Sequence, residues 1–340
     1  MPVITIDASE AHVAPLRGWG RYVSELVRAL GDGAAGDLCI DAALRAGHGP
    51  ELLWEQIGLA HHARRAGSSV LHAPNCFLPL RRPCPGVVTI HDLAFEAHPG
   101  DFSRRTGLKY RTLVPRAVHS AQRVICVSSF TAADVVRRYG VDADKLRVIG
   151  LAPSLARLGR AVSEPPGGPF LLAVGDLRAK KDLLTLIAAW RQLRRQGAEH
   201  RLVVAGVDAG EGPRLRQAAA GEPLELPGYV DDASLDELLC GADVLIHPSR
   251  YEGFGLVLLE AMARGTPVIA ARATALPETA GPGALYFDPG DSSDLAARLQ
   301  ELWGDDALRA RLVAHGRVRA AEASWARTAA LTADVYRELL

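Results

Sequence analysis

The sequence lacks paired cysteines and long apolar segments. Its five cysteines form no C-x-x-C pair and are odd in number, so complete disulfide pairing is excluded and a reducing cytoplasm is expected. No apolar run approaches the roughly 18–20 residues that span a bilayer, because Arg, Gly or Asp interrupts every candidate. The first residues run directly into a strand pattern, so we expect no signal peptide.

The chain also lacks an excess of charge of either sign. Its 39 Lys and Arg residues balance 39 Asp and Glu residues, which removes the long-range positive field that nucleic-acid-binding proteins use. We therefore expect no nucleic-acid partner, and any anionic ligand must be held locally. Lysine itself is scarce, being confined to Lys109, Lys145, Lys180 and Lys181.

Short apolar strands and amphipathic helices alternate along the chain. This alternation is typical of parallel α/β sheets that are buried on both faces, and a length of 340 residues predicts two domains. In the first half the expected strands are Val3–Asp7, Ser69–Ala73, Gly86–Ile90, Arg123–Val127 and Leu146–Ile149. In the second half they are Phe170–Val174, Leu202–Ala205, Val244–His247 and Pro267–Ala270.

Helix-breaking residues between Leu151 and Pro169 separate the two halves. We therefore predict a first domain over residues 1–152 and a second over 153–322, with a C-terminal helix at 323–340 that packs back on the first domain. Ligands of open α/β sheets bind outside the carboxyl ends of the strands. Two such domains that face each other would create a site in the cleft between them.

The most informative segment runs from Val244 to Ala270 as a strand, a polar loop, a helix and another strand. In the loop, Glu252 precedes Gly253-Phe254-Gly255, and the free N–H groups of the helix that starts there can hold phosphate. Glu260 follows eight residues after Glu252, about 20° away on a helical wheel, so both carboxylates can face one ligand. Taken singly, Glu252 could instead be a helix-dipole partner and Glu260 a solvated helix residue.

This segment resembles the E-x7-E motif of glycosyltransferase family 4, which comprises retaining enzymes that use nucleotide-sugar donors, and the resemblance spans nearly the whole chain. It implies the GT-B fold, an α/β architecture of two Rossmann-like domains whose parallel sheets face each other across a cleft. It also implies that Glu252 and the backbone from Gly253 to Leu256 contact the donor sugar and phosphates. Glu260 would bind the ribose hydroxyls through charge-assisted hydrogen bonds.

Two motifs of the first half fit the same family. The segment Arg17-Gly-Trp-Gly-Arg-Tyr22 resembles the family's Gly-x-Gly-Arg-Tyr loop, which implies that Gly18, Trp19 and Gly20 lie near the donor phosphates. An ordinary helix start is the simpler interpretation. His91, followed by Asp92 at a strand end, matches the His-Asp pair that similar enzymes carry at the donor sugar, although a lone histidine is more often structural. Asp92 could orient the imidazole or cap the next loop.

The loop Gly175–Asp182 contains two of the four lysines. A cationic loop at this strand end would neutralise a leaving diphosphate. Lys181 aligns with the family's shared lysine and Lys180 with the arginine that precedes it in some members, whereas Asp176 occupies the arginine position of other members. Arg178 or Lys180 would have to substitute, or donor affinity would be reduced.

The remaining motifs are weaker. Val230 lies in a segment resembling the one that holds the nucleobase through main-chain groups, whereas Val148–Ser154 lacks the Asn-Gly found in many relatives. Asp142-Ala-Asp144 spells a D-x-D metal motif of another glycosyltransferase architecture, but it lies in a turn where acidic residues commonly cap, so we expect no metal.

The resemblance thus implies a retaining, metal-independent hexosyltransferase without a cofactor, and the cysteine pattern places it in the cytoplasm. Its catalytic set would consist of His91, Lys180, Lys181 and Glu252. GDP-mannose is the first expected donor and a UDP-hexose is the second. The acceptor would be a hydroxyl of unknown identity. The alternatives are a GT-B sugar-nucleotide epimerase and a nucleotide-sugar-binding protein with lapsed catalysis. Peripheral membrane contact and the oligomeric state stay open. Four basic residues could touch an anionic acceptor or a lipid headgroup, namely Arg104, Arg105, Lys109 and Arg111. Alternatively, they form only a solvated helix face.

Overall fold

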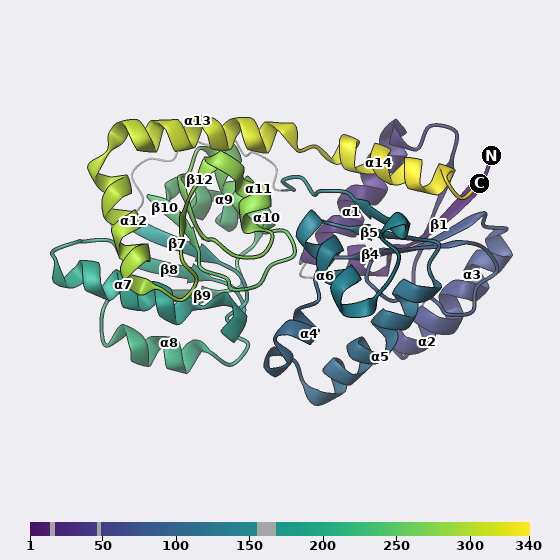
Figure 1. The fold of residues 1–340 in the computed structure, drawn as a ribbon, viewed down its shortest axis with the longest axis horizontal. Coiled ribbons are helices and arrows are strands. Elements are labelled where there is room, and N and C mark those ends of the chain that lie inside the picture. The colour runs from purple at the N-terminus through teal and green to yellow at the C-terminus, as the bar shows by residue number, and fades with distance from the viewer. Residues whose placement is uncertain (14–17, 46–48, 155–167) are drawn as a thin grey trace. The chain divides into compact units, whose positions relative to one another are not determined.

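The computed structural model describes residues 1–13, 18–45, 49–154 and 168–340. The chain divides into two compact units, one formed by Met1–Ala152 with Ala323–Leu340 and the other by Pro153–Glu322. Most of the predicted linker, residues 155–167, lies outside the described residues. Each unit contains a six-stranded parallel sheet, which confirms the predicted α/β class (Figure 1).

The sheet of the first unit has the strand order β2-β1-β3-β4-β5-β6. Its strands are β1 (Val3–Asp7), β2 (Cys39–Ala43), β3 (Val70–Ala73), β4 (Gly86–Ile90), β5 (Arg123–Cys126) and β6 (Leu146–Val148). Its helices are α1 (Gly18–Ala29), α2 (Glu51–Leu53), α3 (Leu59–Ala66), α4 (Ala94–Ala97), α5 (Arg104–Ser120), α6 (Ser129–Tyr139) and α14 (Trp325–Arg337). A π-helical turn at Trp54–Gly58 joins α2 to α3.

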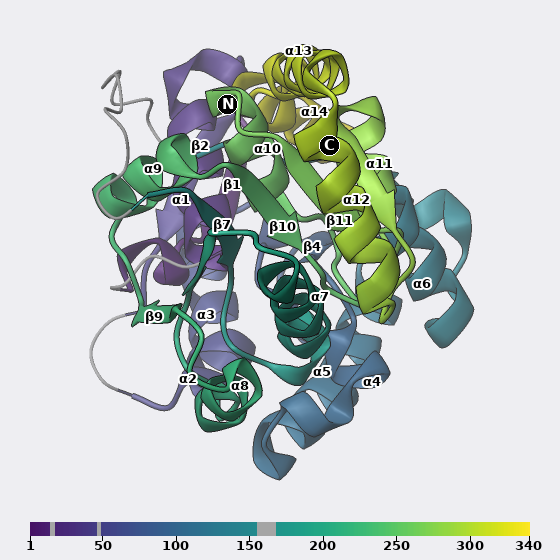
Figure 2. The same ribbon diagram turned by 90° about the vertical axis from the view of Figure 1, so that its left-hand side faces the viewer.

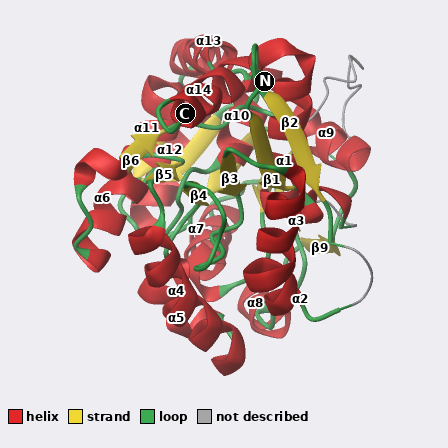
Figure 3. Ribbon diagram, turned by 90° about the vertical axis from the view of Figure 1, so that its right-hand side faces the viewer, coloured by secondary structure: helices red, strands yellow, loops and turns green. Residues whose placement is uncertain are grey.

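Side chains on β3 alternate between the two faces of the first sheet, and different helices pack against each face. Figure 3 shows helices on both sides of this sheet. Leu71 and Ile90 point into a core cluster that also holds residues of α3, α5 and α6. His72, which lies between Leu71 and Ala73, points to the opposite face, where its Nδ1 lies 2.7 Å from the hydroxyl of Tyr336 in α14. The C-terminal helix is thus part of the first unit, and Thr328 anchors it further by donating to the Gly150 carbonyl at 2.8 Å.

The sheet of the second unit has the strand order β12-β11-β10-β7-β8-β9. Its strands are β7 (Phe170–Val174), β8 (Arg201–Ala205), β9 (Leu224–Gly228), β10 (Val244–His247), β11 (Val268–Ala271) and β12 (Ala284–Phe287). Its helices are α7 (Leu183–Arg195), α8 (Gly212–Ala219), α9 (Asp232–Gly241), α10 (Leu256–Arg264), α11 (Leu276–Ala280), α12 (Ser292–Gly304) and α13 (Asp306–Glu322). Helix α7 lies between α8 and α12, while α10 contacts α9, α11 and α13 (Figure 2).

The strand order of the second sheet reverses at β7, which pairs with β8 on one side and with β10 on the other. At such a switch point the connections leave in opposite directions and open a crevice at the carboxyl ends of the strands, where ligands of α/β proteins bind. The loops after β7 and β10 carry Lys181 and Glu252, respectively. The topology therefore places these two predicted residues at the favoured position.

Three strands were not predicted, namely β2, β9 and β12, and all three lie at sheet edges. Edge strands are half-exposed, so their sequences do not need the continuous apolar run of a central parallel strand. In β9, for example, Leu224, Leu226 and Gly228 are half-buried and the residues between them exposed. Among the described residues, no helix is long and apolar enough to cross a membrane.

Candidate active site

The loops after β7 and β10 bring Lys181 and Glu252 into direct contact. The Lys181 ammonium donates to Oε1 of Glu252 at 2.5 Å, and the two side chains are only 16% and 13% exposed. A further bond between the loops fixes this pairing, because the Arg250 amide donates to the Lys180 carbonyl at 2.9 Å. The site thus holds its cation and its carboxylate as a preformed, largely desolvated pair.

Gly175 makes the approach of Lys181 possible. It adopts φ +141°, and a Cβ at this position would lie 2.9 Å from both Cε and Nζ of Lys181. A side chain there would displace the lysine from the end of β7.

The charges around Glu252 decide its ionisation. Burial would raise the pKa of its carboxyl, but Lys181 and Lys180 outweigh burial and hold the pKa well below its usual value. Glu252 therefore stays an anion that can accept hydrogen bonds from donor hydroxyls.

His247, at the end of β10, is a site residue that the motif comparison missed. Its Nε2 lies 3.4 Å from the same Oε1 of Glu252, and the residue is 2% exposed. Burial lowers the pKa of this imidazole. Beneath Lys181 a cavity of about 10 Å³ is lined by His247 and Ser249 among others, and the buried Oγ of Ser249 makes no hydrogen bond to a described residue. The signal that could have found them is His-Pro-Ser at the end of a buried strand.

The residue that precedes helix α10 is a glycine in a conformation that residues with a side chain rarely adopt. Gly255 adopts φ +90°, and a Cβ there would lie 2.7 Å from Cδ2 of Leu276. No side chain caps this helix start, and its first turn contains no acidic residue. The Leu258 amide donates to the Gly255 carbonyl at 3.0 Å, so only the N–H groups that precede it in this first turn retain the capacity to bind an anion. The preceding Phe254 carbonyl accepts a hydrogen bond from the buried Thr279 hydroxyl, which fixes the loop.

Glu260 is also buried on α10, at 5% exposure. Its backbone carbonyl accepts from Nη1 of Arg264 at 2.8 Å, and Arg264 in turn forms a buried ion pair with Asp236 of α9. This pair ties α10 to α9 and fixes the segment from which Glu260 projects. Val230 lies half-buried in the turn between β9 and α9.

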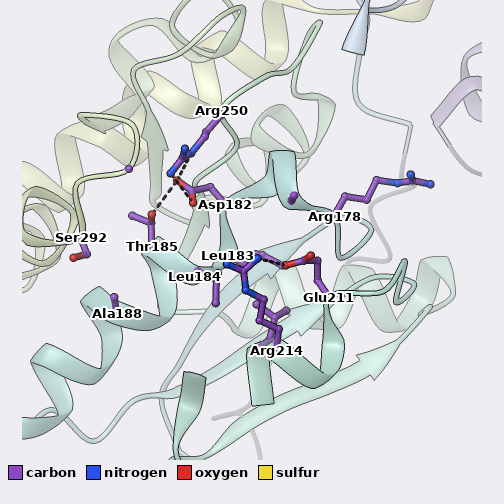
Figure 4. A pocket seen from close by; sticks show the side chains of 13 residues that line it. Arg178, Asp182, Leu183, Leu184, Thr185, Ala188, Glu211, Arg214, Arg250 and Ser292 are labelled. Atoms are coloured by element: carbon purple, nitrogen blue, oxygen red, sulfur yellow. Dashed lines mark hydrogen bonds and ion pairs between the residues drawn. The ribbon is translucent and has the colours of Figure 1, made fainter. Parts of the chain in front are cut away.

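Arg178 lies apart from the Lys181–Glu252 pair, on the wall of a neighbouring cavity of about 440 Å³ (Figure 4). Asp182 in this wall pairs with Nε of Arg250 at 2.9 Å and accepts from the Thr185 hydroxyl at 2.9 Å. Nε of Arg178 lies 3.9 Å from Asp176, and both side chains are about a third exposed. Asp176 therefore lies beside a cation of its own loop, while Glu252 is the carboxylate that contacts Lys181.

In the first unit, aromatic rings surround His91, which is 8% exposed. Its imidazole stacks on Trp19 with ring centroids 5.8 Å apart, and Tyr22 meets it edge-on at 4.8 Å. His91 Nε2 lies 2.9 Å from the Pro74 carbonyl, so the proton resides on Nε2. Burial lowers the pKa of His91 to about 4, which keeps the ring neutral.

The structure thus joins the glycine loop to His91 through Trp19, and Asp92 takes part in the turn that follows His91. Its Oδ1 accepts from the Ala94 amide at 2.9 Å and caps the following helix. Gly18 and Gly20 lie in the first turn of α1, next to residues 14–17, which are not described. Asp142 likewise caps a turn by accepting from the Asp144 amide at 2.9 Å.

Comparisons with known proteins identify the family of this chain. The family described as glycosyl transferases group 1 matches residues 158–319, and the family described as Glycosyltransferase Family 4 matches residues 42–152. The O-antigen chain mannosyltransferase B of Escherichia coli is 29% identical, with 98% of this chain and 99% of the relative covered. The MMP alpha-(1->4)-mannosyltransferase of Mycolicibacterium hassiacum is 31% identical over 66% of this chain, which covers 56% of that longer protein.

Solved structures support the fold. The sucrose-phosphate synthase of Thermosynechococcus elongatus superposes with a TM-score of 0.76 at 23% identity, covering 100% of this chain and 99% of the other. Anabaena HepE in complex with UDP and glucose gives a TM-score of 0.74 at 20% identity, with 99% of each chain covered. Two sequence families, a relative matched over its full length and two six-stranded parallel sheets thus agree, and the chain belongs to the glycosyltransferases of the family 4 type, with a two-domain GT-B fold.

Proposed function

We propose that this glycosyltransferase moves a hexose from a nucleoside-diphosphate sugar to an acceptor hydroxyl, with retention of configuration and without a metal ion. The observation that carries the proposal is the buried Lys181–Glu252 pair at the switch point of the second sheet. It combines a cation for a diphosphate with a carboxylate for sugar hydroxyls. GDP-mannose is the first candidate donor, because two relatives are named mannosyltransferases. A UDP-hexose is the second, because HepE structures contain UDP or UDP-glucose.

In this proposal the donor diphosphate lies at the start of α10, where the backbone from Gly253 to Leu256 offers N–H donors. Lys181 and Lys180 offset the charge that develops as the bond between the anomeric carbon and the phosphate oxygen breaks. The acceptor oxygen bonds to the anomeric carbon on the same face, and its proton passes to the leaving phosphate oxygen. No protein nucleophile is needed. The neutral imidazole of His91 or its adjacent backbone would support the sugar as positive charge develops there.

Thermal shift against GDP-mannose, UDP-glucose, GDP and UDP tests the donor. A ligand that binds only the folded state stabilises it by about 2.7 kcal/mol at a hundredfold excess over Kd. A selective rise in Tm with the guanine pair supports GDP-mannose, and a selective rise with the uracil pair supports a UDP-hexose. No change in Tm with any of the four ligands would contradict the proposed donor class.

Lys181→Ala tests the role of the cation. Loss of one group that stabilises developing charge should reduce donor turnover of the folded variant by roughly 10²–10³-fold, and Tm should fall as well because Glu252 is left without its main partner. The matched control is Arg195→Ala, which removes an exposed cation of the following helix, α7. Comparable turnover in Lys181→Ala and Arg195→Ala would refute this role.

Product analysis with the wild-type protein addresses the two alternatives. A transferase without acceptor releases free sugar slowly, whereas an epimerase returns an altered sugar nucleotide. A lapsed enzyme would give a thermal shift but no turnover. The family matches favour the transferase over both.

A further inference from the structure

We propose that the fork between the ends of β7 and β10 binds one water molecule, through which the Ser249 hydroxyl holds the ammonium of Lys181 in place. Ser249 is then a positioning residue for the reaction. This role rests on the function proposed above for Lys181, whereas the water site rests only on the cavity in the fork and on the groups that line it.

The fork arises from the way the second sheet pairs. Strand β7 pairs with β10 as far as Leu172 and Leu245. Beyond that point β7 continues its pairing with β8 to Val174, and β10 continues its pairing with β11 to His247. The two strands therefore diverge at their carboxyl ends, and polar groups between them need partners other than a neighbouring strand.

A small cavity occupies this fork, beneath Lys181. Its volume is about 10 Å³, and its wall is formed by the strand ends and the residues that follow them, including Gly175, His247 and Ser249. A polar space of this size has room for about one water molecule. It is too small for a sugar, a nucleotide or a phosphate ion.

Ser249 supplies the first polar group of this cavity. The residue is 0% exposed, and its buried Oγ has no hydrogen-bond partner among the described residues. An unpaired buried hydroxyl is costly, so groups of this kind are nearly always bonded to protein or to an enclosed water molecule. The cavity beside Ser249 provides the space for such a water molecule.

Lys181 supplies the second group. Its ammonium carries three N–H donors, and Oε1 of Glu252 accepts from it. The end of its side chain lies close to the Gly175 backbone and lines the same cavity as Ser249. A water molecule in the fork can accept from the ammonium and donate to Ser249 Oγ, which gives the buried hydroxyl a partner.

The charges around the cavity favour water over an ion. The Lys181 ammonium repels a metal cation, and the Glu252 carboxylate that it contacts repels an anion. His247 also lines the cavity, and burial lowers the pKa of its imidazole, so this ring stays neutral at neutral pH. A neutral molecule that both donates and accepts hydrogen bonds fits these surroundings.

The water molecule gives Lys181 a second point of attachment. Glu252 holds the ammonium from the loop after β10, but in the proposed reaction the donor diphosphate competes for the same cation. The bond through water to Ser249 keeps the ammonium at the end of β7 during this exchange. Without that bond, Lys181 still attracts the donor but is poorly placed to offset charge on the leaving phosphate.

A crystal structure of the whole protein that resolves ordered water tests the site directly. We expect one water molecule at about 2.7–3.2 Å from both Ser249 Oγ and Lys181 Nζ. Thermal unfolding tests it independently, through the sign of the change. Ser249→Ala should lower Tm by about 2–4 °C if the hydroxyl is bonded to water, whereas removal of an unpaired buried hydroxyl should raise Tm. A dry cavity, or a Tm that does not fall, would overturn the proposal.

Steady-state kinetics test the positioning role, with whichever of GDP-mannose and UDP-glucose gives the larger thermal shift. Ser249→Ala should lower kcat on the order of tenfold with little change in donor KM, because the ammonium still attracts the diphosphate. Ser249→Cys, which keeps a weak hydrogen-bonding group, should recover part of kcat. The matched control is Ser293→Ala, at an exposed serine of α12, which should change neither Tm nor kcat. Equal kcat values for Ser249→Ala and Ser293→Ala would refute the positioning role.

These measurements separate the water site from the proposed function. The crystal structure and Tm need no donor, so they decide on the water molecule even if Lys181→Ala retains full turnover. If Lys181→Ala loses turnover and Ser249→Ala does not, the proposed function stands and the positioning role of Ser249 is wrong.

Discussion

At the scale of single residues, the site depends on one carboxylate oxygen that serves two partners. Oε1 of Glu252 lies 2.5 Å from the Lys181 ammonium and 3.4 Å from His247 Nε2. A single partner does not fix the rotamer of a glutamate. Here two partners from separate elements approach the carboxylate, a lysine of the loop after β7 and an imidazole at the end of β10, and together they fix it. The ion pair therefore remains aligned with the ligand-binding edge of the sheet.

His247 is accordingly a positioning residue, and its removal should loosen Glu252. We expect His247→Ala to raise the donor KM on the order of tenfold, because misplacement of a binding group by a fraction of an ångström reduces productive binding. His247→Gln, which keeps a hydrogen-bonding group, should recover much of that loss. Steady-state kinetics with the preferred donor provide the measurement, and His315→Ala, an exposed histidine of α13, is the control. Unchanged KM in His247→Ala would contradict the role.

At the scale of elements, the start of α10 needs a left-handed residue. Gly255→Ala would force φ +90° on a residue with a side chain and place its Cβ 2.7 Å from Leu276. We expect it to reduce the free energy of unfolding by about 1–3 kcal/mol and to weaken donor binding as well. Gly304→Ala is the matched control, since a Cβ there meets nothing within 4 Å. Equal Tm values for the two variants would show that the helix start tolerates a side chain.

Helix α14 gives a second prediction at this scale. Tyr336→Phe removes the hydroxyl that lies 2.7 Å from His72 Nδ1 and leaves that nitrogen buried without its partner. The expected loss is about 1–3 kcal/mol in the free energy of unfolding, measured by urea titration. Tyr229→Phe, at a 44% exposed tyrosine, should change little. A similar small effect in both variants would mean that the His72–Tyr336 contact contributes nothing net.

The elements also show what the sequence could and could not predict. Central strands such as β4 and β10 are buried along their whole length, and their predominantly apolar sequences identify them directly. Edge strands such as β9 are half-exposed, so no such run exists. The Lys181 and Glu252 loops were recognised from motifs. The role of His247, in contrast, arises from contact with a residue five positions later, which depends on how the loop folds back.

At the scale of the whole molecule, the zero net charge of the chain does not show how its charged residues are distributed. At the site Lys181 pairs with Glu252, whereas the stretches between Glu55 and Asp92 and between Asp101 and Asp134 contain arginines but no acidic residue. A net charge of zero is therefore compatible with a local anion site and with an uneven distribution of charge along the chain. Composition alone could not distinguish these arrangements, because it carries no information on which charges lie together.

Buried histidines make the stability of the molecule depend on pH. Burial lowers the pKa of His72 to about 3 and that of His91 to about 4, from an ordinary 6.5. Between these values and 6.5 the unfolded chain binds more protons than the folded one, so stability is full above pH 6.5 and falls as the pH falls. Each histidine should contribute a loss of about 1.4 kcal/mol per pH unit.

Comparing Tm at about pH 7 and about pH 5 measures this dependence. His72→Gln keeps hydrogen-bonding capacity toward Thr89 and Tyr336, which flank the imidazole at 2.8 and 2.7 Å, but it cannot be protonated. The variant should therefore lose less stability than the wild type over this interval, whatever its absolute Tm. His119→Gln, at an exposed histidine of α5, should follow the wild type. Parallel pH dependence in wild type and His72→Gln would show that His72 is not protonated on unfolding in this range.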